Sequence, residues 1–428
     1  MTTIFALSSG RPPAGIAVVR ISGPAAFAAL EALSGKASPA PRRLVRRLLI
    51  DPRDASLLDE AMVAGFTGPA SSTGDDLVEL HLHGGVAVVA AVIAVLGTLS
   101  GLELAKPGAF TRRAFDNGKL DLSQVEGLAD LIDADTEAQR RHALDHAGGL
   151  LRERVGAWRA TLIAVRADLE ASLDFAEEDD VPVGIALPGR RQLDVLVAQF
   201  SEAIADASRG ERLRDGLTVA VTGPVNAGKS SLVNAIAQRE VAIVTKYPGT
   251  TRDVLEVRLD LAGVAVTLLD TAGLRETADP VEAEGIRRAI DRAEKADLVI
   301  VLGGASTVEG QLSVVGMADL SPGGAGWRDD VLHLSAKTRD GVDLLLDWLT
   351  AWVIRTARPG EPAVITRERQ RVALAAAEAE LIAGLAAHDA ILAAEHLRRA
   401  TTGLDAIIGV VTNDDILDAI FGRFCLGK

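Results

Sequence analysis

Residues 223–231 read Gly-Pro-Val-Asn-Ala-Gly-Lys-Ser-Ser and lie between the apolar run 217–221 and the helical pattern 232–236. This order predicts a strand, a tight loop and a helix. Glycines let backbone N–H groups turn inward around phosphate oxygens, and the following helix directs its positive N-terminus at them. Because every fixed position of G-x-x-x-x-G-K-S/T is filled in this context, the stretch predicts a phosphate-binding loop.

The side chains of this loop have distinct expected roles. Lys229 supplies a charge to the β- and γ-phosphates, and Ser230 supplies an oxygen to Mg²⁺. The other expected nucleotide contacts in the loop are Asn226, Ala227, Gly228 and Ser231.

Three further segments follow in the order expected for a GTPase. In the stretch 249–253, Thr250 and Thr251 offer hydroxyls, with Thr251 expected on Mg²⁺. After an apolar strand pattern at 264–269, Asp270-Thr271-Ala272-Gly273 provide an acid on the Mg²⁺ side and a glycine N–H for the γ-phosphate. Ser335-Ala336-Lys337 match the loop that packs on a guanine base. The four segments together predict a translation-factor-like GTPase domain.

The guanine-recognition segment departs from the GTPase pattern. Between the strand pattern 298–302 and Ser335, a GTPase carries Asn-Lys-x-Asp, but here Gly316-Met317-Ala318-Asp319 follow the apolar stretch 312–315. The connection between the two strands is also too short for an ordinary helix. Loss of Asn and Lys is expected to weaken binding. Two interpretations stay open. In the first, which the other motifs favour, Asp319 still selects guanine by hydrogen bonding to the base. In the second, Asp319 is only an acidic residue of the loop, and base selection is lost.

Length and composition set limits on the class of protein. At ~150 residues per domain, 428 residues suggest about three domains, and 48% apolar residues supply their cores. No apolar run approaches the ~20 residues of a membrane span, and residues 1–5 show no signal peptide. One cysteine excludes an intramolecular disulfide framework and favours the cytosol. A net charge of −14 argues against a generally basic surface, so RNA would meet a local patch or a partner.

Residues 1 to about 118 are predicted to form a mixed α/β domain. Strand patterns occur at 16–23 and 76–83, and an apolar helix pattern occurs at 86–96. Glu79, His81 and His83 fall on one side of the second strand. The two histidines have a spacing that can face one metal ion. A packed or exposed pair is favoured, because no acidic or thiol partner lies at ligand spacing.

The flanks of the GTPase segment are predicted to be helical. Ser123 and Glu126 have the spacing of a capping box, and the acidic run 177–180 is interpreted as a solvated turn in preference to a metal site. A further helix reaches about Leu213, and the helical pattern resumes at 367–400 and 414–421. The GTPase domain is therefore predicted to be inserted in a helical domain built from both flanks. Six apolar residues recur by fours and threes as a bundle seam: Leu151, Val155, Trp158, Leu162, Val165 and Leu169.

Over essentially its whole length, the chain resembles the MnmE (TrmE) family of tRNA modification GTPases. The resemblance rests on VVRISGP at 18–24, TGDDLVELHLHGG at 73–85, PGAFTRRAFDNGKLDLSQVEGLADLI at 107–132, the GTPase motifs with DTAGLRE at 270–276, and ILDAIFGRFCLGK at 416–428. It implies a multidomain fold of mixed α/β and all-α parts. These are an N-terminal α/β tetrahydrofolate-binding domain at 1–118, a helical domain at 119–214 and 358–428, and an inserted P-loop (Ras-like) GTPase domain at 215–357.

The resemblance also implies an activity and partners. A cytoplasmic homodimer would hydrolyse GTP and work with the flavoprotein MnmG, which carries the FAD. Together they would place an aminomethyl-type group on carbon 5 of the wobble uridine of certain tRNAs. The alternative is a divergent P-loop GTPase switch with weakened guanine recognition, for example in ribosome assembly.

Carried over residue by residue, the resemblance places a 5-formyl- or methylene-tetrahydrofolate near Arg20, Glu79, Lys119 and Lys428. A carboxylate such as Glu79 suits the donor and acceptor edge of a pterin, and cations suit the glutamate tail. Without the resemblance, Arg20 and Glu79 would be interpreted as surface charges at strand ends. Cys425 is implied beside the folate, where a part in one-carbon chemistry and a purely structural role stay equally open.

Hydrolysis needs a group that orients water. After Gly273, where Ras-like GTPases keep a glutamine, Leu274 cannot hydrogen-bond water. The resemblance assigns this role to Glu282, which joins Lys229 and Cys425 as a candidate catalytic residue.

The charge-offsetting role of an arginine finger is assigned by the resemblance to K⁺. Two GTPase domains would meet across the nucleotide around this ion. The alternative for Asn226 is a residue that only stabilises the turn. The implied K⁺ ligands are Asn226, Thr245, Tyr247 and Thr250.

Overall fold

The computed structural model describes residues 2–174, 189–239, 241–243, 256–270, 293–304, 308, 310–410, 414–422, 424 and 427. The chain divides into two compact units, residues 1–129 with 404–428, and residues 130–403. The last residues of the chain thus belong to the same unit as the first. The four-segment division at residues 118, 214 and 357 stays a prediction. None of the helices within the described ranges is long and apolar enough to cross a membrane.

The first unit contains a six-stranded sheet in the order β3-β4-β5-β2-β1-β6. Only β1 and β6 pair in parallel, and every other neighbouring pair is antiparallel. The sequence patterns at 16–23 and 76–83 are both confirmed as strands. The strands are β1 (Thr3–Leu7), β2 (Ile16–Ser22), β3 (Val45–Ile50), β4 (Leu57–Phe66), β5 (Leu77–His83) and β6 (Leu102–Leu104).

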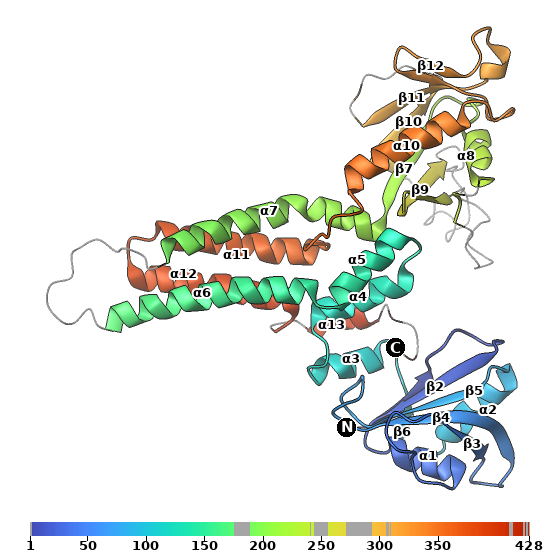
Figure 1. Ribbon diagram of the computed structural model, residues 1–428, viewed down its shortest axis with the longest axis vertical. Coiled ribbons are helices and arrows are strands. Elements are labelled where there is room, and N and C mark those ends of the chain that lie inside the picture. Colours follow the sequence, from blue (N-terminus) through green and yellow to red (C-terminus); the bar gives the residue numbers. More distant parts are fainter. Residues whose placement is uncertain are drawn as a thin grey trace. The chain divides into compact units, whose positions relative to one another are not determined.

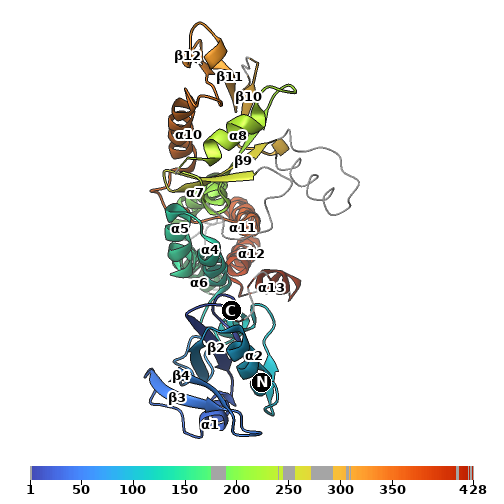
Figure 2. The ribbon, with the colours of Figure 1, turned by 90° about the vertical axis from the view of Figure 1, so that its right-hand side faces the viewer.

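Helices cover one face of this sheet and leave part of the other open. α1 (Ala26–Ser34) and α2 (Val86–Leu96) share one core with apolar strand residues such as Val19 and Leu80. Figure 2 shows the two helices beside the strands of this sheet. On the opposite face, Phe110 of α3 (Ala109–Asp116) packs with Ile4 and Ala6. A small separate core joins α4 (Leu122–Asp133) to α13 (Asp414–Phe421).

The start of α4 corrects the predicted capping box. The carboxylate of Asp121 accepts hydrogen bonds from Gln124 N at 2.9 Å and from Ser123 Oγ at 2.6 Å. The side chain of Gln124 accepts in return from Asp121 N at 3.1 Å. Ser123 and Glu126 are instead buried in the helix interface. The helix therefore begins two residues earlier than the Ser123 signal suggested, because Asp121 and Gln124 form the reciprocal pair that satisfies the free N–H groups.

The second unit contains a seven-stranded sheet in the order β12-β13-β11-β10-β7-β9-β8. The five central strands are parallel, and β12 and β8 pair antiparallel at the edges. α8 (Lys229–Ala237) and α10 (Val342–Ala357) pack against its core (Figure 1). The strands are β7 (Leu217–Thr222), β8 (Glu256–Leu261), β9 (Val264–Asp270), β10 (Leu298–Leu302), β11 (Gln311–Val315), β12 (Gly326–Arg328) and β13 (Val331–His333).

Helices precede and follow this sheet in the chain. They are α5 (Glu137–Ala147), α6 (Leu150–Asp174) and α7 (Arg190–Asp215) before it, and α11 (Glu368–Ala386) and α12 (Ala390–Ile408) after it. The seam on α6 is confirmed, because its six apolar residues are at most 3% exposed. Trp158 of the seam packs edge-on against Phe200 of α7 with ring centroids 4.9 Å apart. α11 lies along α7 (Figure 1).

The pattern at 367–400 predicted one helix, but the structure breaks it between α11 and α12. Ala387 leaves the helical conformation with ψ 136°. The Asp389 carboxylate then accepts hydrogen bonds from the N–H groups of Ile391 and Leu392 at 2.7 and 3.2 Å. The apolar spacing continues across a tight chain reversal when both helices bury the same face. The sequence pattern therefore did not reveal the break between α11 and α12.

Arg209 joins α7 to the segment that returns from α10, and we call its contacts the Arg209 clamp. Its side chain is 6% exposed and donates to the carbonyl oxygens of Glu361 at 2.7 Å and Pro362 at 3.1 Å. Nε and Nη2 also donate to the Asp206 carboxylate at 2.7 and 2.5 Å. Gly210 follows, and a Cβ there would overlap the carbonyl oxygen of Ile365. The return segment is thus held by donors and close contact from α7.

Two buried histidines of α5 support the same segment. His146 Nε2 lies 2.9 Å from the carbonyl oxygen of Ala363 and is assigned as its donor. His142 packs against it with ring centroids 4.6 Å apart, and its Nε2 is buried without a hydrogen-bond partner. Burial lowers the pKa of His142 to about 3, with further contributions from His146, Arg209 and Arg214. His142 is therefore neutral at physiological pH and acts as packing.

Replacing Arg209 by methionine keeps the volume but removes the donors. The half-buried Asp206 carboxylate then keeps its contact with Arg358 but loses Arg209, and the carbonyl oxygens of Glu361 and Pro362 lose the Arg209 donors, which together costs about 3 kcal/mol. We expect the melting temperature, followed by far-ultraviolet circular dichroism, to fall by at least about 5 °C. Arg398→Met is the matched control, because Arg398 is an exposed arginine paired with Glu395 on its own helix. Equal melting temperatures for the two variants would contradict the clamp.

Candidate functional site

The described nucleotide motifs meet at one edge of the seven-stranded sheet. Parallel strands end at the same edge, so the carboxyl ends of β7, β9, β11 and β13 lie together. A Cβ on Gly316 would be 3.3 Å from the carbonyl oxygen of Ala227. Ala318 N donates to Leu334 O at 3.0 Å. The phosphate-binding loop and the two base-side segments are therefore neighbours, as the sequence order predicted.

The backbone of the loop explains its glycines. Gly223, Asn226 and Gly228 have φ angles of 144°, 64° and 92°, all in the region that disfavours most side chains. A Cβ on Gly223 would also overlap the carbonyl oxygen of Leu302. α8 then begins at Lys229, so its free N–H groups face the loop. The predicted strand, loop and helix are confirmed.

Lys229 is folded onto its own loop. Its side chain is 7% exposed, and Nζ donates to the carbonyl oxygens of Gly223 and Pro224, both at 2.8 Å. A buried ammonium needs such acceptors. Phosphate oxygens carry more negative charge than carbonyls, so a bound nucleotide can compete for the same donors.

Ser230 and Asp270 form the magnesium side of the site. The Ser230 hydroxyl donates to Asp270 Oδ2. Asp270 ends β9 and is fully buried. A hydroxyl and a carboxylate in contact are the hard oxygen donors that Mg²⁺ prefers, usually with water and phosphate completing its octahedron. These two residues fit that ion.

The base side is built from backbone contacts. Asp319 lies in the short turn η2 (Ala318–Leu320) and is exposed, after Met317 in a left-handed conformation with φ 58°. Ser335 is 1% exposed, and its Oγ accepts from Thr338 N at 3.2 Å. Lys337 beside it is exposed. The structure thus brings Asp319 and the segment 335–337 to the same edge of the sheet. Gly316 has no side chain with which to contact a base bound there.

The connections around the base side are short. Parallel strands usually need a dozen or more residues, often a helix, between them. The stretch from β11 to β13 is fully described and holds only η2 and β12, without an α-helix. β10 and β11 are joined by residues 303–310. The prediction that this connection lacks room for an ordinary helix agrees with those bounds.

Several predicted site residues lie outside the described part of the chain, and their assignments remain predictions. Among the described site residues, Asn226 is exposed. The undescribed ones are Thr245, Tyr247, Thr250, Thr251, Thr271, Ala272, Gly273, Glu282, Cys425 and Lys428.

A second polar group occupies the open face of the six-stranded sheet. Arg20 and Glu79 are paired across β2 and β5, and Arg20 Nη2 lies 2.9 Å from Glu79 Oε1. His81 Nε2 lies 3.3 Å from the other Glu79 oxygen. The Arg20 guanidinium also stacks 5.8 Å from the centroid of the Phe110 ring. Arg20 and Glu79 are only 27% and 20% exposed, so they are more enclosed than ordinary surface charges.

Two other predicted residues of this unit lie apart from that group in their contacts. Lys119 donates to the carbonyl oxygen of Pro69 at 2.9 Å. His83 Nδ1 lies 2.7 Å from Asp59 Oδ1, so the two histidines of β5 have different acidic partners. No cluster of three or more metal-ligating side chains occurs among the residues that the structure describes.

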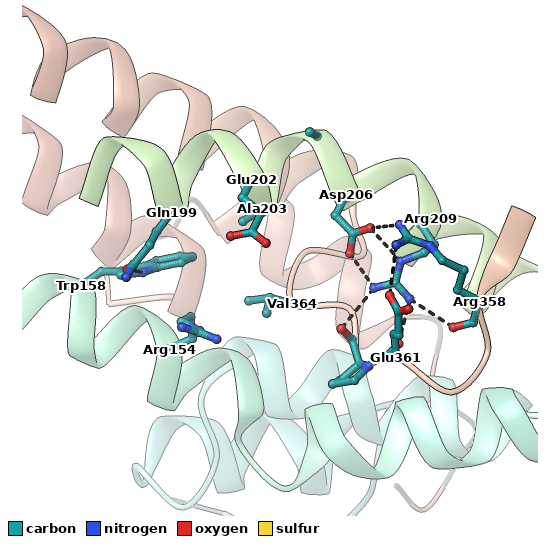
Figure 3. A pocket seen from close by; sticks show the side chains of 12 residues that line it. Arg154, Trp158, Gln199, Glu202, Ala203, Asp206, Arg209, Arg358, Glu361 and Val364 are labelled. Atoms are coloured by element: carbon teal, nitrogen blue, oxygen red, sulfur yellow. Dashed lines mark hydrogen bonds and ion pairs between the residues drawn. The ribbon is translucent and has the colours of Figure 1, made fainter. Parts of the chain in front are cut away.

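A pocket of about 500 Å³ lies beside the Arg209 clamp, between α6, α7 and the return segment (Figure 3). Its inner charges neutralise one another. Arg358 Nη2 contacts Asp206 at 3.1 Å and Arg358 Nη1 contacts Glu361 at 3.1 Å. None of its lining residues belongs to a nucleotide motif. It is a feature of the helical junction.

Sequence reasoning missed three contributors to these sites. Phe110 lies in the quoted segment 107–132, but its position under Arg20 depends on α3 folding back on the sheet. The pattern of β5 predicted His81 as one of a packed or exposed pair in preference to a metal ligand, but it did not reveal the contact of His81 with Glu79. Arg209 carried no local signal, because its partners are about 150 residues away in the chain.

Sequence comparisons with known proteins cover the whole chain. The family model described as the MnmE helical domain matches residues 122–425, and that of the GTP-binding protein TrmE N-terminus matches residues 3–119. The chain is 51% identical to the tRNA modification GTPase MnmE of Azorhizobium caulinodans, over 100% of this chain and 99% of that protein. The same protein of Methylobacterium sp. (strain 4-46) is also 51% identical, with the same coverage.

Among solved structures, the FeoB G-domain from Methanococcus jannaschii is 24% identical and covers 32% of this chain and 97% of its own. Its TM-score of 0.22 is too low to support an inference.

Replacing Lys229 by methionine removes the charged donor of the loop. A hydrogen bond to a charged group contributes about 1.5–3 kcal/mol, so GTP should bind on the order of 10- to 100-fold more weakly. Isothermal titration with Mg²⁺-GTP measures this change. Lys337→Met is the control for the loss of an exposed lysine beside the site and should have the smaller effect. Wild-type affinity in Lys229→Met would contradict the assigned role.

Proposed function

This chain belongs to the MnmE family of tRNA modification GTPases, and on that premise we propose that it uses GTP hydrolysis to drive modification of carbon 5 of the wobble uridine in certain tRNAs. The observation that carries the GTPase half is the contact of Ser230 with the buried Asp270, beside the Lys229 loop. That arrangement suits a Mg²⁺-bound nucleoside triphosphate. Similarity at 51% identity over full length supports the tRNA half.

The proposed hydrolysis site has three functions. Backbone N–H groups of the loop and Lys229 hold the β- and γ-phosphates. Ser230, Asp270 and Thr251 would hold Mg²⁺, which neutralises charge as the phosphoryl group leaves. Glu282 would orient the attacking water through a second water. Thr251 and Glu282 come from the family resemblance.

K⁺ is proposed to complete the charge balance. The side-chain carbonyl of Asn226 would be one ligand, with Thr245, Tyr247 and Thr250 as the others. Asn226 suits the role, because it is exposed in the loop and makes no hydrogen bond to the residues that the structure describes. When bound, the ion supplies positive charge opposite the phosphates, as an arginine finger does elsewhere. The proposal includes a homodimer in which two such loops face each other.

Guanine selection is proposed to rest on Asp319. Its carboxylate is exposed at the base edge and has no partner within the described ranges. Gly316 and Met317 stand where GTPases carry Asn and Lys, and the absence of those side chains favours weak binding of the guanine base. A second candidate function is therefore a divergent GTPase switch with reduced base selection. Titration with GTP, GDP and ATP separates the two, since only the first predicts a preference for guanine.

The one-carbon donor is proposed to bind the open sheet face. Glu79, held between Arg20 and His81, would face the pterin, and Lys119 and Lys428 would attract the glutamate tail. The chain end supports this position, because Gly427 O accepts a hydrogen bond from Ser8 Oγ at 2.6 Å, directly after β1. Cys425 would lie nearby, with its role undecided between chemistry and structure. The donor is a 5-formyl- or methylene-tetrahydrofolate.

The remaining chemistry is proposed to come from a flavoprotein partner, MnmG, which carries the FAD. The inserted position of the seven-stranded domain, between α7 and α11, would let the closing of two nucleotide sites act on the helices. The proposed location is the cytoplasm, where the single cysteine stays reduced.

Deleting the chain should leave carbon 5 of the wobble uridine unmodified in the substrate tRNAs. Mass analysis of nucleosides from tRNA of cells with and without the chain measures this, and a plasmid copy should restore the modification. Lys229→Met, which cannot hold GTP normally, should not restore it. Unchanged wobble uridines in the deletion strain would refute the proposed function.

GTP turnover should be faster in KCl than in NaCl at equal ionic strength. The expected difference is at least about tenfold, a fraction of the 10³ to 10⁵ that an arginine finger provides. Asn226→Ala should remove the difference, whereas Asn234→Ala, on the exposed side of α8, should keep it. Equal rates in the two salts would reject the K⁺ site.

A further inference from the structure

Charge is unevenly distributed along this acidic chain. The whole protein carries a net charge of −14, but residues 1–129 hold twelve acidic and twelve basic residues and are neutral. Within them, no Asp or Glu occurs from residue 32 to residue 50. That stretch contains five cations: Lys36, Arg42, Arg43, Arg46 and Arg47. We call residues 36–47 the basic edge.

The basic edge lies at the border of the six-stranded sheet. β3 is the terminal strand in the order of the sheet and pairs with β4 alone. Arg42 and Arg43 are exposed in the turn before it, and the Arg46 side chain is 76% exposed. From Arg43 to Arg47 an extended chain advances about 13 Å, which corresponds to several nucleotide steps along one strand of nucleic acid.

Most hydrogen-bond donors of the basic edge are unused. The Arg43 side chain makes no hydrogen bond or ion pair with any residue in the described ranges, and the Arg42 side chain makes one contact, to Ala70 O at 3.3 Å. Arg47 contacts only the neighbouring carbonyl of Arg46 at 3.2 Å, and Arg46 pairs with Glu60. Arginines elsewhere differ. Arg398 and Arg399, for example, are both occupied by Glu395 at 2.7–2.9 Å.

We propose that the basic edge binds the phosphate backbone of RNA, and that this RNA is the tRNA substrate. The inference rests on the proposed function, which requires an acidic protein to hold a polyanion. Guanidinium groups bind phosphate with two parallel N–H donors. A stretch without acidic residues that exposes Arg42, Arg43 and Arg46 is the local patch that such a protein needs, and the free edge keeps it accessible to a long ligand.

Contacts of this kind have a measurable signature. Each neutralised phosphate releases counterions, so the logarithm of affinity falls with the logarithm of salt concentration by ~0.7–0.9 per contact. Removing two phosphate-binding arginines should therefore lower that slope by about 1.5. It should weaken binding similarly for all tRNA sequences, because phosphate contacts carry no base information.

The test uses the full-length chain and a transcribed tRNA with uridine at the wobble position, with fluorescence anisotropy over a series of KCl concentrations. Arg42→Gln/Arg43→Gln should bind on the order of tenfold more weakly at low salt and show the reduced slope. Arg42→Lys/Arg43→Lys keeps the charges and should keep the slope. Arg398→Gln/Arg399→Gln removes the same charge from an acid-paired site and should bind like wild type.

Unchanged affinity and slope in Arg42→Gln/Arg43→Gln would overturn the proposal, as would a wild-type chain that binds no tRNA at any salt. The proposal would also be overturned if this variant bound tRNA normally and lost affinity only for a partner protein. In that case the basic edge would be a protein-binding surface. GTP turnover without tRNA should be identical in all variants, because none of the substituted residues belongs to the nucleotide site, and unchanged melting curves of the variants exclude misfolding. If the basic edge binds tRNA as expected but deletion of the chain leaves the wobble uridines unchanged, the proposed function is refuted, and only the RNA-binding part of this inference stands.

Discussion

One buried guanidinium holds together the two places where the chain enters and leaves the seven-stranded domain. Arg209 donates to Asp206 on its own helix and to the carbonyls of Glu361 and Pro362, which follow α10. Glu361 and Pro362 are exposed, whereas Ala363, Ile365 and Thr366 directly after them are buried. The clamp therefore holds the return segment at the point where its buried part begins, and α11 then packs back along α7. Any movement of the seven-stranded domain would be passed to the helices through this junction.

The nucleotide edge shows the same dependence of function on buried polar contacts. Lys229 and Asp270 are almost completely buried, yet each has a partner: loop carbonyls for the ammonium and the Ser230 hydroxyl for the carboxylate. These partners keep two opposite charges in place before a nucleotide arrives. The base side lacks this support, because Gly316 and Met317 provide no polar side chain. The phosphate end of the site is consequently better organised than the base end.

The polar and charged groups of the first unit lie on separate parts of its six-stranded sheet. Helices α1 and α2 bury one face of the six-stranded sheet. The open face concentrates Arg20, Glu79 and His81 in one connected group. The unpaired border of the sheet carries the arginines of the basic edge. The proposed small-molecule site and the proposed polyanion surface therefore use different side chains of one sheet.

Local patterns in the sequence determined the elements that depend on near neighbours. The phosphate-binding loop, the strands at 16–22 and 77–83 and the seam of α6 all follow from spacing within a few residues, because backbone conformation and amphipathic periodicity are local properties. The sequence also determined the family, through motifs spread over all regions. Only the tertiary structure decided the Asp121 cap of α4, the break at Ala387, the stacking of Arg20 on Phe110 and the Arg209 clamp. In each case a competing acceptor, a chain reversal or a partner far away in the chain made the choice, and such long-range contacts leave no periodic trace.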